Sequence, residues 1–144
     1  DMGPTLYGYC SVCSRSFATG DFDPKSAEIY EVTLEAQLAA LDGIRAGVSA
    51  SGVDRIARDI IDRAGFGEHF GHGLGHGVGI EIHEAPRLGP RSEDLLMAGD
   101  VVTVEPGIYL PGEAGVRIED MVVVGEDGIS RNFSTLDKKL TVVA

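Results

Sequence analysis

The chain has 144 residues, the length of one ordinary domain or of a piece of a larger one. Hydrophobic residues make up 43% and charged residues 24%, which is typical of a folded globular protein and argues against a disordered chain. The net charge of −11 argues against nucleic acid or an anionic membrane surface as a partner. Two cysteines are too few for a disulfide framework, and no apolar run approaches the roughly 20 residues of a membrane-spanning helix.

The first 18 residues predict a hairpin, because Gly3-Pro4 and Gly8 punctuate two short apolar stretches. This strand-like sequence begins almost at once after Asp1, and no initiator methionine precedes it. We therefore expect a fragment or a processed product of a longer chain.

The next segment predicts a helix that starts at Asp23-Pro24, with an acceptor side chain at the N-cap and proline at the first helical position. We expect this helix to end near Gly47. Its apolar stripe, at helical spacing, comprises Tyr30, Leu34, Leu38 and Leu41.

A second helix is predicted to begin with Ser51 as the cap and Asp54 in the capping-box position, and to end at Gly65. Its predicted buried face is Val53, Ile56, Ala57, Ile60, Ile61 and Ala64. The remainder is strand and turn, with strand-like segments at 100–110, 115–124 and 140–143. The fold class is therefore α+β, with two helices covering one face of a sheet.

Glycine occupies every odd position from 71 to 79, which disfavours a helix and predicts extended chain. In extended chain His72 and His76 project from one face, while the other face is bare backbone that a ligand or another strand can approach closely. His83 follows a few residues later. The alternative is a glycine-rich loop whose histidines face solvent.

Two carboxylates interrupt apolar strand sequence. Glu105 follows three valines and a threonine, and Glu119 shares a strand face with Arg117 by parity. A buried glutamate is costly unless it is paired or binds a metal, although a cross-strand salt bridge at a solvated sheet edge is the alternative for either residue. Together with the histidines, these are ligands that divalent transition metals accept.

These motifs resemble those of the pita-bread metallopeptidases, which comprise methionine aminopeptidase, aminopeptidase P and prolidase. The motifs are Gly8-Tyr9-Cys10-Ser11, Ser14-Arg15-Ser16-Phe17, His72-Gly73-Leu74-Gly75-His76, His83-Glu84-Ala85-Pro86, Val104-Glu105-Pro106-Gly107 and Arg117-Ile118-Glu119-Asp120. The pairing of His72 with His76 resembles the aminopeptidase P and prolidase branch. The resemblance implies a partial pita-bread fold, with a curved antiparallel sheet, in which residues 1–144 form the C-terminal portion of the catalytic domain.

The resemblance also implies a set of metal ligands, namely Asp1, His76, Glu105 and Glu119. The family's second aspartate is expected eleven residues after the first, where this chain has Val12. A valine offers no lone pair, so we expect one divalent ion rather than two. Manganese is the expected metal, with cobalt or zinc as alternatives.

The other functional residues that the resemblance implies are His72 and His83, for substrate binding and stabilisation of the tetrahedral intermediate. Glu105 would shuttle the proton, and Arg117 would orient the neighbouring carboxylates. The implied activity is hydrolysis of Xaa-Pro bonds in peptides with proline in the second position, by a cytoplasmic, homo-oligomeric parent protein. A catalytically inactive binding domain and a metal-free hydrolase of creatinase type are the alternatives, both suggested by Val12.

Four remaining residues receive no catalytic function from the sequence. Cys10 and Cys13 are three apart in a predicted strand, so their thiols should diverge. Glu84 and Asp120 are predicted to be solvated carboxylates.

Overall fold

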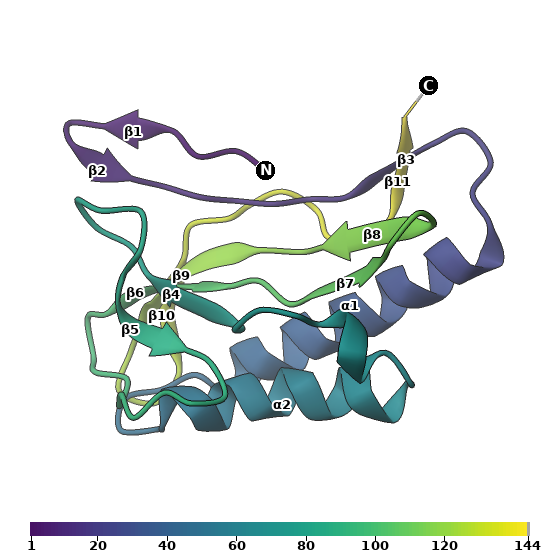
Figure 1. Cartoon of the computed structure of the whole chain (residues 1–144). Coiled ribbons are helices and arrows are strands. Elements are labelled where there is room, and N and C mark those ends of the chain that lie inside the picture. Colours follow the sequence, from purple (N-terminus) through teal and green to yellow (C-terminus); the bar gives the residue numbers. More distant parts are fainter. Residues whose placement is uncertain (144) are drawn as a thin grey trace.

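The computed structural model describes residues 1–143, in which two helices lie on one side of a set of short strands (Figure 1). The largest sheet is antiparallel, with the strand order β10-β9-β6-β4-β5. Its strands are β4 (Gly75–Gly77), β5 (Glu84–Leu88), β6 (Val101–Val104), β9 (Asp120–Val124) and β10 (Ile129–Asn132). A separate antiparallel pair consists of β7 (Gly107–Leu110) and β8 (Ala114–Arg117).

The first helix, α1 (Pro24–Gly43), begins as predicted, because the Asp23 carboxylate accepts hydrogen bonds from the backbone N–H groups of Lys25 and Ser26. The predicted apolar stripe was wrong at Leu38, whose surface is 50% exposed. Helix α1 packs against the second helix, and the buried face of α1 is rotated away from Leu38. Its members are Ile29, Tyr30, Thr33, Ala36, Gln37 and Ala40.

The second helix, α2 (Ala50–Arg63), is capped by Ser49, whose hydroxyl accepts a hydrogen bond from the Gly52 N–H at 3.1 Å. The predicted cap at Ser51 was therefore wrong by two residues. The predicted end is confirmed, because Gly65 adopts the left-handed backbone conformation, with φ +87°, that follows many helices. Ala64 is exposed, whereas Val53, Ala57 and Ile61 are buried.

The N-terminal segment forms the predicted hairpin from β1 (Thr5–Leu6) and β2 (Tyr9–Cys10). An isolated β-bridge between Met2 and Cys13 extends this pairing. Beyond it the chain crosses the side of the strands opposite the helices (Figure 1), where Ser14 pairs with Glu119. It then forms β3 (Phe17–Thr19), which is parallel to β11 (Thr141–Val143). The chain's first 20 residues thus lie beside its last quarter.

One apolar core joins the helices to the sheet, with Ile29, Ile44 and Ile61 facing Leu74, Val102 and Val122. A short 3₁₀ helix, Gly67–His69, leads from α2 toward β4. The predicted α+β class, with two helices over an antiparallel sheet, is confirmed. Neither helix combines the length and apolarity that crossing a bilayer requires.

Candidate active site

The strand order places His76 beside Glu105. His76 lies in β4, which pairs with β6 through Gly77 and Val102, and Glu105 follows directly after β6. The His76 Nε2 atom lies 3.2 Å from Glu105 Oε1. Thr103 holds both residues, because its hydroxyl accepts from the His76 N–H and donates to Glu105 Oε1, each at 3.0 Å.

The glycines of the alternating run allow this close pairing. A Cβ atom on Gly75 would collide with the carbonyl group of Thr103, and one on Gly77 would collide with the carbonyl group of Ala85. The bare backbone face predicted from the sequence is therefore occupied by neighbouring strands and not by solvent. The opposite face carries His76, which is buried, and His72, which is half-buried.

The His76 imidazole is oriented by its own chain. Its Nδ1 atom lies 2.9 Å from the Gly77 carbonyl oxygen, which can only accept, so Nδ1 carries a proton and Nε2 faces Glu105. Burial lowers the pKa of His76, but hydrogen bonds to Glu105 and Gly77 and the charge of Glu105 outweigh it, so the pKa is raised overall. Burial raises the pKa of Glu105, yet hydrogen bonds from His76 and Thr103 bring it below its ordinary value.

Glu119 is buried behind this pair. Its Oε2 atom accepts a hydrogen bond from the Ser14 hydroxyl at 2.6 Å. Burial, followed by repulsion from Glu105, raises the pKa of Glu119 despite the Ser14 hydrogen bond.

Asp1 and Arg117 form an ion pair at the edge of the site. The Arg117 Nε–H also donates to the Ser14 hydroxyl at 3.0 Å, so one guanidinium contacts both Asp1 and the residue that holds Glu119. The Asp1 side chain is 57% exposed. Among residues 1–143, no three His, Cys, Asp or Glu side chains converge closely enough to hold a metal ion.

Val12, at the position where the sequence comparison expects an aspartate, is buried. It packs against Val78 and Met121 in a small apolar cluster separate from the main core. Its surroundings therefore suit an aliphatic side chain and offer no replacement donor.

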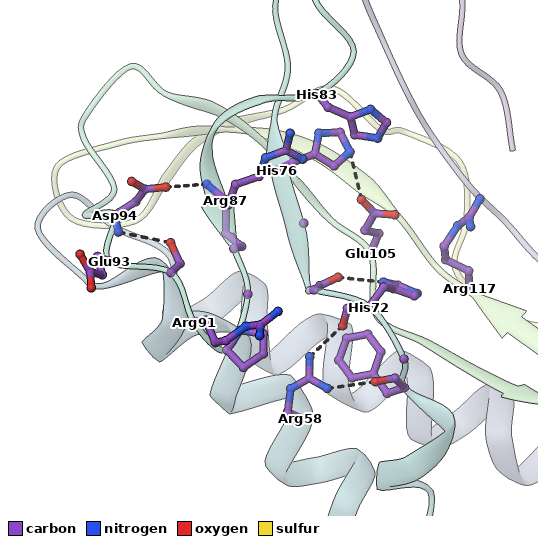
Figure 2. Close-up of a pocket in the computed structure, with 18 residues that line it drawn as sticks. Arg58, His72, His76, His83, Arg87, Arg91, Glu93, Asp94, Glu105 and Arg117 are labelled. Atoms are coloured by element: carbon purple, nitrogen blue, oxygen red, sulfur yellow. Dashed lines mark hydrogen bonds and ion pairs between the residues drawn. The ribbon is translucent and has the colours of Figure 1, made fainter.

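A pocket of about 800 Å³ opens over His76 and Glu105 (Figure 2). His83, an exposed residue, places its ring 4.3 Å from the His76 ring, between centroids. On the other side, His72 Nε2 lies 2.9 Å from the Tyr109 hydroxyl, while His72 Nδ1 faces the Gly73 carbonyl oxygen at 2.8 Å.

The sequence reasoning missed several residues that contribute to this region. Besides Arg117, the pocket wall includes three arginines: Arg58, Arg87 and Arg91. Ser14, Thr103 and Tyr109 hydrogen-bond directly to candidate site residues. The signal available for Ser14 was its place in a quoted motif, whereas Tyr109 lies 37 residues from His72 and is connected to it only by the fold.

The prediction that Asp120 is a solvated carboxylate was wrong. Its side chain has no exposed surface and contacts Arg15 at 2.7 Å and Lys138 at 2.6 Å. Burial raises the pKa of Asp120, but hydrogen bonds from Lys138, Asn132 and Arg15 lower it overall. Glu84 is half-buried, and its Oε1 atom accepts a hydrogen bond from the Glu81 N–H at 2.8 Å.

The two cysteines diverge as predicted. Cys10 directs its thiol to the Ile80 carbonyl oxygen, and Cys13 directs its thiol to the Glu119 carbonyl oxygen. Neither forms a disulfide bond within residues 1–143.

Comparison with known proteins shows to which family the chain belongs. Residues 1–126 match metallopeptidase family M24. The chain belongs to this family. It is 46% identical over 143 residues to the Xaa-Pro dipeptidase of Lactobacillus helveticus, covering 99% of this chain and 39% of that protein. It is also 47% identical over 135 residues to the Xaa-Pro dipeptidase of Pyrococcus furiosus, covering 94% of this chain and 39% of that protein.

Solved structures agree with the M24 assignment and with the predicted pita-bread fold. A dipeptidase from Pyrococcus horikoshii superposes with a TM-score of 0.95 at 42% identity, over 98% of this chain and 39% of that chain. An Xaa-Pro dipeptidase from Bacillus anthracis superposes with a TM-score of 0.92 at 48% identity, over 94% of this chain and 38% of that chain. The chain thus spans about two fifths of the length of these relatives.

The M24 family implies a divalent metal ion. His76, Glu105 and Glu119 offer one nitrogen and two carboxylates, donor types that such an ion accepts, although within residues 1–143 these side chains do not gather around a common point. Val12 has no donor atom, and Asp1 is paired with Arg117.

Proposed function

We propose that the full-length protein containing this chain is a metal-dependent peptidase that hydrolyses Xaa-Pro dipeptides. The contact between His76 and Glu105 at the floor of an open pocket, with His72 and His83 on either side, carries this proposal. The names of the M24 relatives supply the substrate class. The proposal assigns residues 1–144 to the C-terminal portion of a catalytic domain.

In this proposal, His76, Glu105 and Glu119 hold a single divalent ion, of which manganese suits the mixed imidazole and carboxylate donors, with cobalt or zinc as alternatives. When bound, such an ion lowers the pKa of a water molecule and polarises a peptide carbonyl group. Arg117 keeps Ser14 in place, and Ser14 in turn orients the Glu119 carboxylate.

Glu105 accepts the proton of the attacking water and delivers it to the leaving amine. Its lowered pKa leaves the carboxylate ionised at neutral pH, as a proton acceptor requires. His83 flanks the pocket at a position from which an imidazole N–H stabilises the developing oxyanion, whereas His72, whose ring nitrogens face Tyr109 and Gly73, lines the pocket as a substrate contact. One donor of this kind is worth about 3 kcal/mol of transition-state stabilisation.

The pocket also suits the far end of a dipeptide. The C-terminal carboxylate of a dipeptide lies one residue from the scissile bond, so a binding site for it needs a cation within that reach. Arg87 and Arg91 line the same pocket as Glu105. Glu93 and Asp94 line this wall as well, so Arg87 and Arg91 are the cations that we assign to the free carboxylate of the substrate.

The test is hydrolysis of Xaa-Pro dipeptides by the full-length protein, purified without chelators and supplied with manganese. We expect hydrolysis by the wild type, about one bound ion per chain by elemental analysis, and loss of activity in Glu105→Gln. Glu113→Gln, an exposed carboxylate on the turn between β7 and β8, is the matched control and should retain activity.

Val12→Asp tests the single-ion part of the proposal. We expect this variant to bind a second equivalent of metal, because the carboxylate restores the absent donor. A wild-type protein that binds two ions would contradict the single-ion proposal. A protein that binds no metal and cleaves no Xaa-Pro dipeptide would contradict the peptidase function and favour an inactive binding domain.

A further inference from the structure

The loop that carries His72 lies beside helix α2 on one of its sides. Strand β4 begins only at Gly75, so the backbone polar groups between Phe70 and Leu74 need other partners. Arg58 donates to the Phe70 carbonyl oxygen at 3.0 Å and to the His72 carbonyl oxygen at 2.8 Å. The Leu74 N–H donates to the Asp54 carboxylate at 3.0 Å.

These three contacts alternate along the loop. Residues 70, 72 and 74 turn their backbone groups to the same side, as the residues of a strand do toward a neighbouring strand. The partners here are two side chains of α2, one helical turn apart. Asp54 and Arg58 therefore occupy the place of a sheet neighbour for this segment.

The two side chains are locked together. Arg58 Nε and Nη2 each lie 2.9 Å from a different oxygen of Asp54, which is the bidentate geometry that a guanidinium forms with a carboxylate. Asp54 is 1% exposed. Its charge is thus compensated by Arg58, and both of its oxygens are used.

Arg58 also supports the imidazole through an aromatic ring. Its guanidinium carbon lies 4.3 Å from the Phe70 ring centroid, and the Phe70 ring meets the His72 ring edge to face at 5.0 Å. Figure 2 shows Arg58 below His72, joined to its loop by hydrogen bonds. One guanidinium therefore fixes both the backbone of His72 and the ring against which its imidazole packs.

We propose that Asp54 and Arg58 are positioning residues that hold His72 in place at the wall of the pocket. An effect of Arg58 on catalysis rests on the proposed function, in which His72 contacts the substrate. The position of His72 does not rest on it, because the hydrogen bonds and ring contacts that fix His72 are independent of the reaction. A lysine at position 58 could not reproduce the arrangement, because one ammonium group cannot form the paired hydrogen bonds that the planar guanidinium forms with the Asp54 carboxylate.

The experiment compares Arg58→Ala with Arg55→Ala, an exposed arginine of the same helix, in the full-length protein. We expect Arg58→Ala to lower kcat/KM for an Xaa-Pro dipeptide about 100-fold, the size of effect that misplacing a substrate contact produces. Added guanidinium ion should restore part of this loss, since it can occupy the vacated position. Arg55→Ala should stay within about twofold of the wild type and show no response to guanidinium.

Imidazole ¹⁵N spectra supply a readout that does not depend on activity. We expect the His72 resonances to shift in Arg58→Ala and in Arg58→Lys but not in Arg55→Ala. Unchanged His72 resonances in either folded position-58 variant would overturn the proposal. A wild-type protein without peptidase activity would instead overturn the proposed function, while the spectra would still decide whether Arg58 positions His72.

Discussion

A single hydroxyl connects the charged groups around Glu119. Ser14 donates to the Glu119 carboxylate at 2.6 Å and accepts from Arg117 at 3.0 Å, and it is itself buried. Arg117 in turn forms an ion pair with Asp1. The orientation of the carboxylate therefore depends on a residue that would not itself touch a metal ion.

Removing the Ser14 hydroxyl tests this dependence. We expect Ser14→Ala to weaken manganese binding by the full-length protein at least about 10-fold, because hydrogen-bond partners of metal ligands typically have effects of this size. Isothermal titration calorimetry measures the change. Ser11→Ala, in the same segment, serves as the control, and equal affinities for the two variants would refute the assigned function of Ser14.

At the residue scale, the sequence could predict that His76 and Glu105 lie close together, but not how each side chain is held. The alternating glycines correctly predicted a backbone that neighbours approach closely, and the motifs brought His76 and Glu105 to attention. The error at Asp120 has a physical reason. Its ion-pair partner Arg15 lies 105 residues away in the chain, so no local pattern could show that this carboxylate is compensated and buried.

At the scale of elements, helix α2 carries two functions on different faces. Val53, Ala57 and Ile61 anchor it in the core, while Asp54 and Arg58 contact the loop of His72. Its first turn depends on the Ser49 cap, which follows the left-handed turn at Gly47, with φ +81°. That turn places Ser49, and not Ser51, at the start of the helix. Helical periodicity alone could not distinguish the two serines.

A pair of variants separates the two candidate caps. Ser49→Ala should lower the free energy of unfolding by about 1 kcal/mol, since the Gly52 N–H loses its acceptor. Ser51→Ala, already within the helix, should change it by a few tenths of a kcal/mol at most. Chemical denaturation of the full-length protein provides the measurement, and the reverse order of stabilities would place the cap at Ser51.

At the scale of the whole molecule, the fold brings together segments that are distant in sequence. The site draws on residues near the start of the chain, on the loop before β4, and on the ends of β6 and β8. The fold class and the two helices could be predicted from apolar periodicity and helix caps. The parallel pairing of β3 with β11 could not be predicted, because two short strands at opposite ends of the chain carry no local sign of their partner.

Metal binding at this site should stabilise the entire protein. A ligand at 100 times its Kd that binds only the folded state adds about 2.7 kcal/mol to the free energy of unfolding. We expect manganese to produce an increase of this order in the wild-type full-length protein and a much smaller one in Glu105→Gln. Denaturation curves with manganese and with a chelator measure it, and identical curves for the wild type would exclude a site in the folded state.

The glycines beside His76 make the site vulnerable in an unusual way. Even a methyl group on Gly75 or Gly77 would push against a carbonyl oxygen of the adjoining strand. An alanine there would force β4 away from β6 or β5 and separate the imidazole from Glu105 without altering either one. Loss of the site by mutation could therefore begin at positions that carry no chemistry, and a scan restricted to polar residues would overlook them.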